Sequence, residues 1–155
     1  MLPGDRLLCV FLDERPAGDS FTDWPLHITI VPWFRTAVPT NELTAHMKER
    51  LNSVTPFTFI VGGEAGFGFK GRKLVNLVEQ PSPLDTIERQ TRNLLHEHEA
   101  WLVDETTKKR RSFRPHVTVQ KSGRVHEGDT FLCNALYIVE QKGGGHKEIS
   151  ARIEL

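Results

Sequence analysis

The 155 residues include 20 Lys plus Arg and 20 Asp plus Glu, so the formal net charge is zero, and 38% of the residues are hydrophobic. This length fits one domain, or two small lobes that share one core. The balanced charge excludes a non-specific nucleic-acid coat protein, because such a protein needs an overall positive field. A local basic cleft that binds an RNA end or a nucleotide remains compatible with it.

The sequence shows no pattern typical of a membrane or secreted protein. No run approaches the roughly 18 apolar residues that span a bilayer, and the N-terminal residues lack a signal-peptide pattern. The two cysteines, Cys9 and Cys133, lie in apolar strand-like runs outside any CxxC pair. We therefore expect buried thiols rather than a disulfide or a zinc site. We also expect a cytoplasmic protein and a monomer.

The first half of the chain predicts mainly strands. Apolar or alternating runs indicate strands at residues 6–13, 26–31, 57–61 and 74–78. The second of these is expected to stop at Pro32. Residues 40–54 predict a helix with one apolar face, and a glycine-rich connection joins the last two strands.

The second half predicts one long helix and three strands. The helix is expected to begin at Ser82-Pro83 and to reach Trp101, since apolar residues recur there at helical spacing. The charged residues 104–114 are typical of a solvated loop. Three strand-like runs follow, separated by glycine turns, at residues 116–120, 130–140 and 148–155.

A pattern of His, apolar, Thr, apolar occurs twice, as HITI at residues 27–30 and HVTV at residues 116–119. The copies are more than half the chain apart, which is too far for a solenoid repeat. One copy is a weak signal, because His and Thr are common on the exposed face of a sheet. Two copies with the same apolar flanks favour two related lobes, each giving one motif to a shared cleft.

The motif geometry suits phosphodiester cleavage. Residues i and i+2 of a strand point to the same face, so His27 projects with Thr29 and His116 projects with Thr118. One neutral imidazole can take a proton from the attacking oxygen, and one imidazolium can give a proton to the leaving oxygen. The threonine hydroxyls can donate hydrogen bonds to the non-bridging phosphoryl oxygens. This scheme needs no metal and no cofactor.

The paired motifs resemble those of the two-histidine phosphoesterase superfamily, in particular its RNA 2′,3′-cyclic phosphodiesterase or 2′-5′ RNA ligase-like branch. Residues 113–119, FRPHVTV, are similar to the family's signature of aromatic, any residue, Pro, His, apolar, Thr, apolar. Residues 56–59, 66–68 and 74–77 resemble the family's middle strand pair. The resemblance covers about residues 6 to 122.

The resemblance implies an α+β fold over residues 1–155, with two pseudo-symmetric lobes, mostly antiparallel sheets lining a central cleft, and helices outside. It further implies a metal-independent phosphodiesterase that opens the 2′,3′-cyclic phosphate of an RNA 3′ end or a nucleotide to a 2′-phosphomonoester. In this reading His27 is the acid, His116 is the base, and Thr29 and Thr118 bind the phosphate. No membrane partner is implied.

Three other functions remain open. Two are enzymatic: 2′-5′ RNA ligation, and cleavage of other 2′-5′ or cyclic phosphodiesters. The third is a nucleotide- or RNA-binding module that does not turn over its ligand. The presence of both histidines and both threonines favours an enzyme.

Further residues near the motifs are candidates for substrate contact. Trp33 and Phe34 directly follow the first motif and can stack a nucleobase, although packing in the core or at its rim is the commoner role. Arg110, Arg111 and Arg114 precede the second motif and can meet an RNA phosphate, although a solvated loop is the simpler interpretation.

Residues 66–71 formally match the dinucleotide-binding pattern GxGxxG. That fingerprint requires a helix next, whereas a strand-like run follows here. We therefore expect a glycine-rich hairpin loop. Lys70 in this loop, with its neighbours Arg72 and Lys73, can still reach a phosphate at the rim of the cleft, although a solvated hairpin tip is the simpler interpretation.

Overall fold

The computed structural model describes residues 1–106 and 112–155. The strands are β1 (Arg6–Phe11), β2 (Ser20–Phe21), β3 (His27–Arg35), β4 (Phe57–Phe67), β5 (Lys73–Val78), β6 (Trp101–Leu102), β7 (His116–Thr118), β8 (Thr130–Cys133), β9 (Ala135–Gly143) and β10 (His146–Glu154). The helices are α1 (Thr40–Arg50) and α2 (Pro83–Glu97), with short 3-10 turns η1 (Phe69–Gly71) and η2 (Val103–Glu105).

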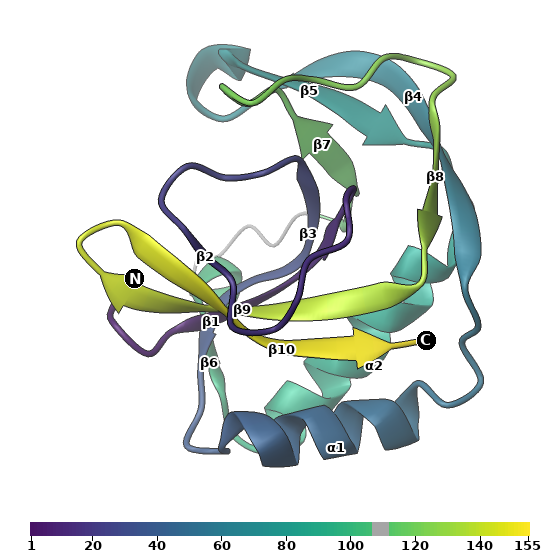
Figure 1. The fold of residues 1–155 in the computed structure, drawn as a ribbon. Coiled ribbons are helices and arrows are strands. Elements are labelled where there is room, and N and C mark those ends of the chain that lie inside the picture. The colour runs from purple at the N-terminus through teal and green to yellow at the C-terminus, as the bar shows by residue number, and fades with distance from the viewer. Residues whose placement is uncertain (107–111) are drawn as a thin grey trace.

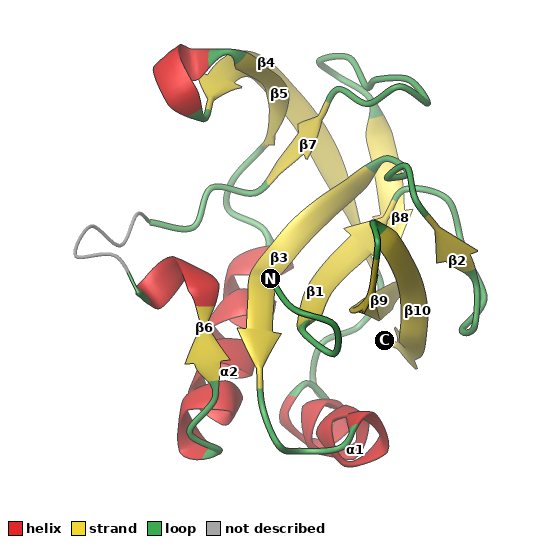
Figure 2. Ribbon diagram, turned by 90° about the vertical axis from the view of Figure 1, so that its left-hand side faces the viewer, coloured by secondary structure: helices red, strands yellow, loops and turns green. Residues whose placement is uncertain are grey.

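The strands form one antiparallel sheet in the order β2-β10-β9-β1-β3-β7-β5-β4-β8, with β6 paired to β3. The sheet curls, so that β4, β5 and β7 lie on one side of the molecule and both helices on the other (Figures 1 and 2). The expected α+β fold with antiparallel strands is confirmed. The chain returns in β9, which pairs with β1, and in β10, which pairs with β9, so the half of the sheet that contains β1 combines strands from both ends of the chain.

The core has two layers because β1 is buried on both faces. Alternate residues of the sheet pack against the helices, in a cluster that includes Leu8, Val10, Ile28, Leu43, Met47, Leu84, Leu95 and Val117. The other face of β1, which we call the inner face, carries a second cluster that includes Leu7, Cys9, Phe11, Trp33, Tyr137, Val139 and Ile149. This double burial fixes β1 and its neighbour β3, which starts with the first motif.

The expectation that Pro32 ends the first motif strand is wrong, since β3 continues to Arg35. The pairing of β3 with β1 is irregular between Leu8↔Val31 and Arg6↔Phe34, and Pro32 lies in this interval. A proline lacks the N–H that a regular ladder requires, but an irregular position does not need it. The motif strand is therefore longer than the sequence indicated.

The second helix is shorter than expected. It ends at Glu97, and the chain reverses through Glu99, which has a φ of 55°. Trp101 and Leu102 then form β6 against β3 rather than a last helical turn. Elsewhere β4 extends to Phe67, and the expected strand 130–140 is divided into β8 and β9.

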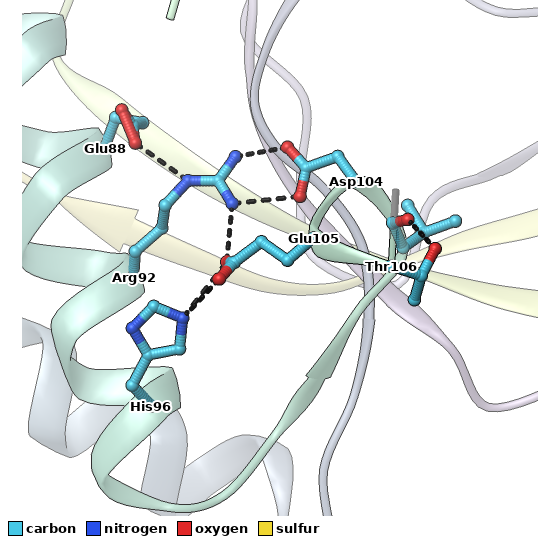
Figure 3. A network of polar contacts seen from close by, with 7 residues as sticks. Glu88, Arg92, His96, Asp104, Glu105 and Thr106 are labelled. Atoms are coloured by element: carbon cyan, nitrogen blue, oxygen red, sulfur yellow. Dashed lines mark hydrogen bonds and ion pairs between the residues drawn. The ribbon is translucent and has the colours of Figure 1, made fainter. Parts of the chain in front are cut away.

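A network of charged groups ties α2 to the segment that follows β6 (Figure 3). The buried Arg92 donates hydrogen bonds to Glu88, Asp104 and Glu105, and His96 contacts Glu105 through Nε2 at 2.7 Å. Burial opposes the charge of Arg92, but its hydrogen bond to Asp104 and the nearby carboxylates raise its pKa above the ordinary value. The network therefore fixes η2 on the helix.

Two expectations about the whole chain can be compared with the structure. Cys9 and Cys133 are both free and buried, as expected, and burial raises the pKa of the Cys133 thiol to about 12. In the described parts of the chain, neither helix is long and apolar enough to cross a membrane.

Candidate active site

The two motif strands are neighbours in the sheet. β3 and β7 run antiparallel, with Ile28 paired to Val117. Both of these apolar residues are at most 1% exposed and belong to the helix-side core. Because side chains alternate along a strand, the histidine and threonine of each motif must point to the inner face.

The register sets the four side chains as the corners of one small patch. With Ile28 opposite Val117, His27 lies across from Thr118 and Thr29 lies across from His116. The two histidines are therefore diagonal neighbours, for which backbone positions are roughly 7–8 Å apart. All four residues are partly exposed, so their polar ends are accessible from the inner face.

The two imidazoles are held in the same way. Nδ1 of His27 lies 2.8 Å from the carbonyl oxygen of Pro25, and Nδ1 of His116 lies 2.7 Å from that of Arg114. A carbonyl accepts only, so each Nδ1 carries the proton and donates it. In the neutral ring Nε2 is then the unprotonated nitrogen, free to accept a proton.

Aromatic side chains support both rings. The indole of Trp24 stacks on His27 with ring centroids 4.3 Å apart and an interplanar angle of 26°. On the other side of the patch, Phe67 of β4 meets His116 edge-on at 4.4 Å. Phe11, which pairs with His27 across β1 and β3, adds a third ring. These contacts restrict the imidazoles to defined orientations and partly bury them.

Burial is the main cause of the low basicity of the histidines. It lowers the pKa of His27 to about 4, opposed by the bond to Pro25 and assisted by the positive charges of Lys73 and His116. Burial also lowers the pKa of His116, with further lowering from Lys73 and Arg114. Both rings are thus neutral near pH 7 without a ligand, and a bound anion would raise both pKa values.

The two aromatic candidates beside the first motif differ in position. Trp33 is 9% exposed and packs in the inner-face cluster, where the centroid of its ring lies 6.4 Å from that of Trp24. Phe34 is 1% exposed and packs on the helix side. Because a ring so deeply buried cannot stack on a base, Phe34 is withdrawn as a substrate contact. Trp24, which no motif in the sequence singles out, stacks on His27 instead.

The basic candidates are also distributed unequally. The Nζ atom of Lys70 lies over the exposed ring of Phe69, at 5.4 Å from its centroid, at the tip of the β4–β5 hairpin. The guanidinium of Arg114 lies 4.9 Å from the centroid of Phe67, close to His116. Arg110 and Arg111 fall outside the described residues.

The glycine-rich segment is a hairpin, as expected. Gly66 lies near the end of β4, η1 makes the turn, and β5 follows without an intervening long helix. A β-carbon on Gly66 would come within 2.4 Å of the carbonyl oxygen of Gly71, so a close approach of two backbones explains the glycine there. Within residues 1–106 and 112–155, no three His, Cys, Asp or Glu side chains cluster so that they could hold a metal ion.

Comparison with solved structures shows the same fold over nearly the whole chain. The crystal structure of TT0787 from Thermus thermophilus matches with a TM-score of 0.63, 19% identity and 97% coverage of both chains. E. coli LigT complexed with 3′-AMP matches with a TM-score of 0.59, 14% identity and 99% coverage of both chains. Usb1 from Kluyveromyces marxianus matches with a TM-score of 0.50, 10% identity and 99% coverage of both chains.

At these identities the structures support the fold alone, and no curated protein matches the sequence. The sequence itself matches the family described as the 2′-5′ RNA ligase superfamily over residues 9–140, a span that contains both motif strands. This span is well over half of the chain. The protein therefore belongs to the 2′-5′ RNA ligase superfamily, the two-histidine phosphoesterases.

Proposed function

We propose that the protein is a metal-independent phosphodiesterase that opens the 2′,3′-cyclic phosphate of an RNA 3′ end or a nucleotide. The product is a 2′-phosphomonoester. The observation that carries the proposal is the inner-face patch, where two imidazoles with free Nε2 atoms lie diagonally across two strands from each other. Two threonine hydroxyls occupy the other corners.

The proposed reaction is one in-line displacement. Nε2 of His116 takes a proton from a water molecule, whose oxygen forms a bond to phosphorus while the bond from phosphorus to O3′ breaks. Nε2 of His27, protonated at the start, gives its proton to the departing O3′. The rings end with exchanged protonation states, and proton exchange with solvent restores them.

The surroundings of the rings support this division of roles. A face-to-face contact with an indole favours a cation, so Trp24 favours the imidazolium form of His27. A bound phosphate anion offsets the burial that lowers the pKa of His27 in the free protein. Beside His116, the positive charge of Arg114 favours the neutral ring, which is the form that a base requires, whereas Lys73 lowers the pKa of both rings and does not distinguish them.

Thr29 and Thr118 are assigned to the phosphate. Each lies across from the histidine of the other motif and two residues from the histidine of its own motif, so each shares the inner face with both rings. A hydroxyl there can donate to a non-bridging oxygen, where negative charge grows during the displacement. LigT, which shares the fold, has been crystallised with 3′-AMP and with NADP⁺, and a nucleotide ligand is consistent with our proposal.

Phosphorus NMR of the products formed from a 2′,3′-cyclic nucleotide tests the proposal. We expect a 2′-phosphomonoester, the same rate with and without EDTA, and a bell-shaped pH–rate profile. His27→Ala and His116→Ala should each reduce turnover by at least about 10² to 10⁴-fold. EDTA inhibition that one divalent ion reverses would contradict the mechanism.

A substrate panel separates the remaining functions. Joining of RNA ends, or faster cleavage of 2′-5′ linked or ADP-ribose-type cyclic phosphates, would identify one of the other enzymatic activities. Tight binding of cyclic nucleotides without any product would identify a binding module.

A further inference from the structure

β5 brings a cationic side chain to the inner face beside the second motif. Val75 pairs with Thr118 and Leu77 pairs with His116, so these residues of β5 share the face of the motif side chains. Lys73, two residues before Val75, lies on the same face because side chains alternate along the strand. It also pairs across the hairpin with Phe67, whose ring contacts His116.

The ammonium of Lys73 acts on both imidazoles. After burial, which is the largest cause in each case, its positive charge lowers the pKa of His27 and also that of His116. A single cation can do this only if it lies near both rings. Lys73 is exposed, and among residues 1–106 and 112–155 no carboxylate lies within 4.0 Å of its Nζ atom.

A cation directed at two histidines is unfavourable when either ring is protonated, unless an anion lies between them. A phosphoryl group is such an anion. During in-line displacement its attacking and leaving oxygens lie on one axis, while negative charge spreads over the non-bridging oxygens. The two histidines exchange protons with the attacking and leaving oxygens, and a cation beside this axis can stabilise the negative charge on the non-bridging oxygens.

We propose that Lys73 is a third phosphate-contacting group of this site, which binds a non-bridging oxygen of the phosphoryl group held between His27 and His116. This inference rests on the proposed function for its substrate. Lys73 acts through its positive charge and transfers no proton. Its charge stabilises the substrate phosphate and, more strongly, the transition state.

The neighbouring cation Arg72 offers a matched control. The carbon at the centre of its guanidinium lies 5.8 Å from the centroid of Phe69, whose ring is 76% exposed at the hairpin tip. Arg72 and Lys73 carry the same charge and are adjacent in sequence. Of these two residues, Lys73 is the one whose charge lowers the pKa values of His27 and His116, so position rather than charge separates them.

The test compares Lys73→Met, Lys73→Arg and Arg72→Met with the unchanged protein. With a 2′,3′-cyclic nucleotide, Lys73→Met should lower kcat/KM by roughly 10- to 100-fold, somewhat less than the loss of a buried oxyanion donor because water and salt screen an exposed charge. Lys73→Arg should recover most of the rate, and Arg72→Met should stay within about twofold.

Two measurements need no turnover and so remain valid if the proposed substrate is wrong. NMR titration of the histidine rings should show the pKa values of both His27 and His116 rising in Lys73→Met and unchanged in Arg72→Met. Inorganic phosphate should bind Lys73→Met more weakly than the unchanged protein, by roughly 10-fold.

The outcomes distinguish the two claims. Weaker phosphate binding and raised pKa values in Lys73→Met support the inference even if no cyclic nucleotide is hydrolysed, and a lack of hydrolysis then counts against the proposed function alone. If Lys73→Met matches Arg72→Met in phosphate affinity and in both histidine pKa values, the inference is overturned. Equal activity of these two variants, in a protein that hydrolyses the substrate, overturns it as well.

Discussion

The burial of His27 makes the stability of the fold depend on pH in a defined window. The ordinary pKa of a histidine is 6.5, and burial lowers that of His27 to about 4. Between these values the unfolded chain binds a proton at this position that the folded protein does not bind. The free energy of unfolding therefore rises with pH through this window. The contribution of His27 to it is lost as the pH falls from about 6.5 towards 4.

The size of this effect follows from the two pKa values. A difference of one pKa unit corresponds to about 1.4 kcal/mol, so the difference between 6.5 and about 4 gives a contribution from His27 of at most about 3 to 4 kcal/mol. His116 acts in the same direction, because its pKa is also lowered by burial. The carboxyl of Asp5 acts in a different window: its hydrogen bond with Arg35 lowers its pKa from 3.8, so its contribution is lost only at more acidic pH.

Urea unfolding at a series of pH values between about 7.5 and 4.5 measures the effect. His27→Asn is a suitable variant, since an amide N–H can still donate to the carbonyl of Pro25. Between about pH 7.5 and 4.5 the free energy of unfolding of the unchanged protein should fall by about 2 to 3 kcal/mol more than that of this variant. His146→Asn, at an exposed position, is the control and should follow the unchanged protein. Identical pH dependence of His27→Asn and the unchanged protein would refute the reasoning.

Two further predictions concern the threonines and the charged network. Thr29→Val or Thr118→Val should each lower kcat by roughly 10- to 10³-fold, because each removes a donor to the phosphate, while unfolding free energies measured in urea stay within about 1 kcal/mol. Arg92→Met should destabilise the fold by about 2–4 kcal/mol, since it removes the buried guanidinium that pairs with Asp104 and Glu105. Arg50→Met, at a more exposed ion pair, should change stability by less than about 1 kcal/mol in the same assay. Equal losses from the two arginine variants would contradict this ranking.

The face of each motif was predictable from the sequence. Period-two alternation over residues 27–30 and 116–119 places histidine and threonine together, and apolar neighbours on the opposite side, which is what β3 and β7 show. The direct pairing of these strands was not predictable. It depends on sheet order, and β7 lies between β3 and β5 because of contacts far apart in sequence.

Element boundaries depended on tertiary contacts that a local pattern does not contain. A proline at position 32 ends the strand only if the ladder is regular, and the pairing of β1 with β3 is irregular there. Trp101 follows the helical spacing of α2, yet it pairs with Arg35 as part of β6. In both cases a partner strand decided the conformation.

The side chains around the candidate site show the same limit of prediction from sequence. In the sequence, Lys70 and Lys73 are two lysines of the same glycine-rich segment, and nothing local distinguishes them. In the structure, the hairpin turn directs Lys70 over Phe69, and the alternation of side chains along β5 brings Lys73 to the inner face. Phe34 looked as suitable for stacking as Trp33 because both follow the first motif. Burial on the helix side excludes it.

The most direct test of the central claim is a crystal structure of the complex with a uridine–vanadate adduct, a five-coordinate mimic of the in-line transition state. The account predicts one vanadium centre with its two apical oxygens within hydrogen-bond distance, about 2.6–3.2 Å, of Nε2 of His27 and Nε2 of His116 respectively. An adduct that contacts only one of these rings, or that binds elsewhere in a protein that still hydrolyses the cyclic nucleotide, would contradict it.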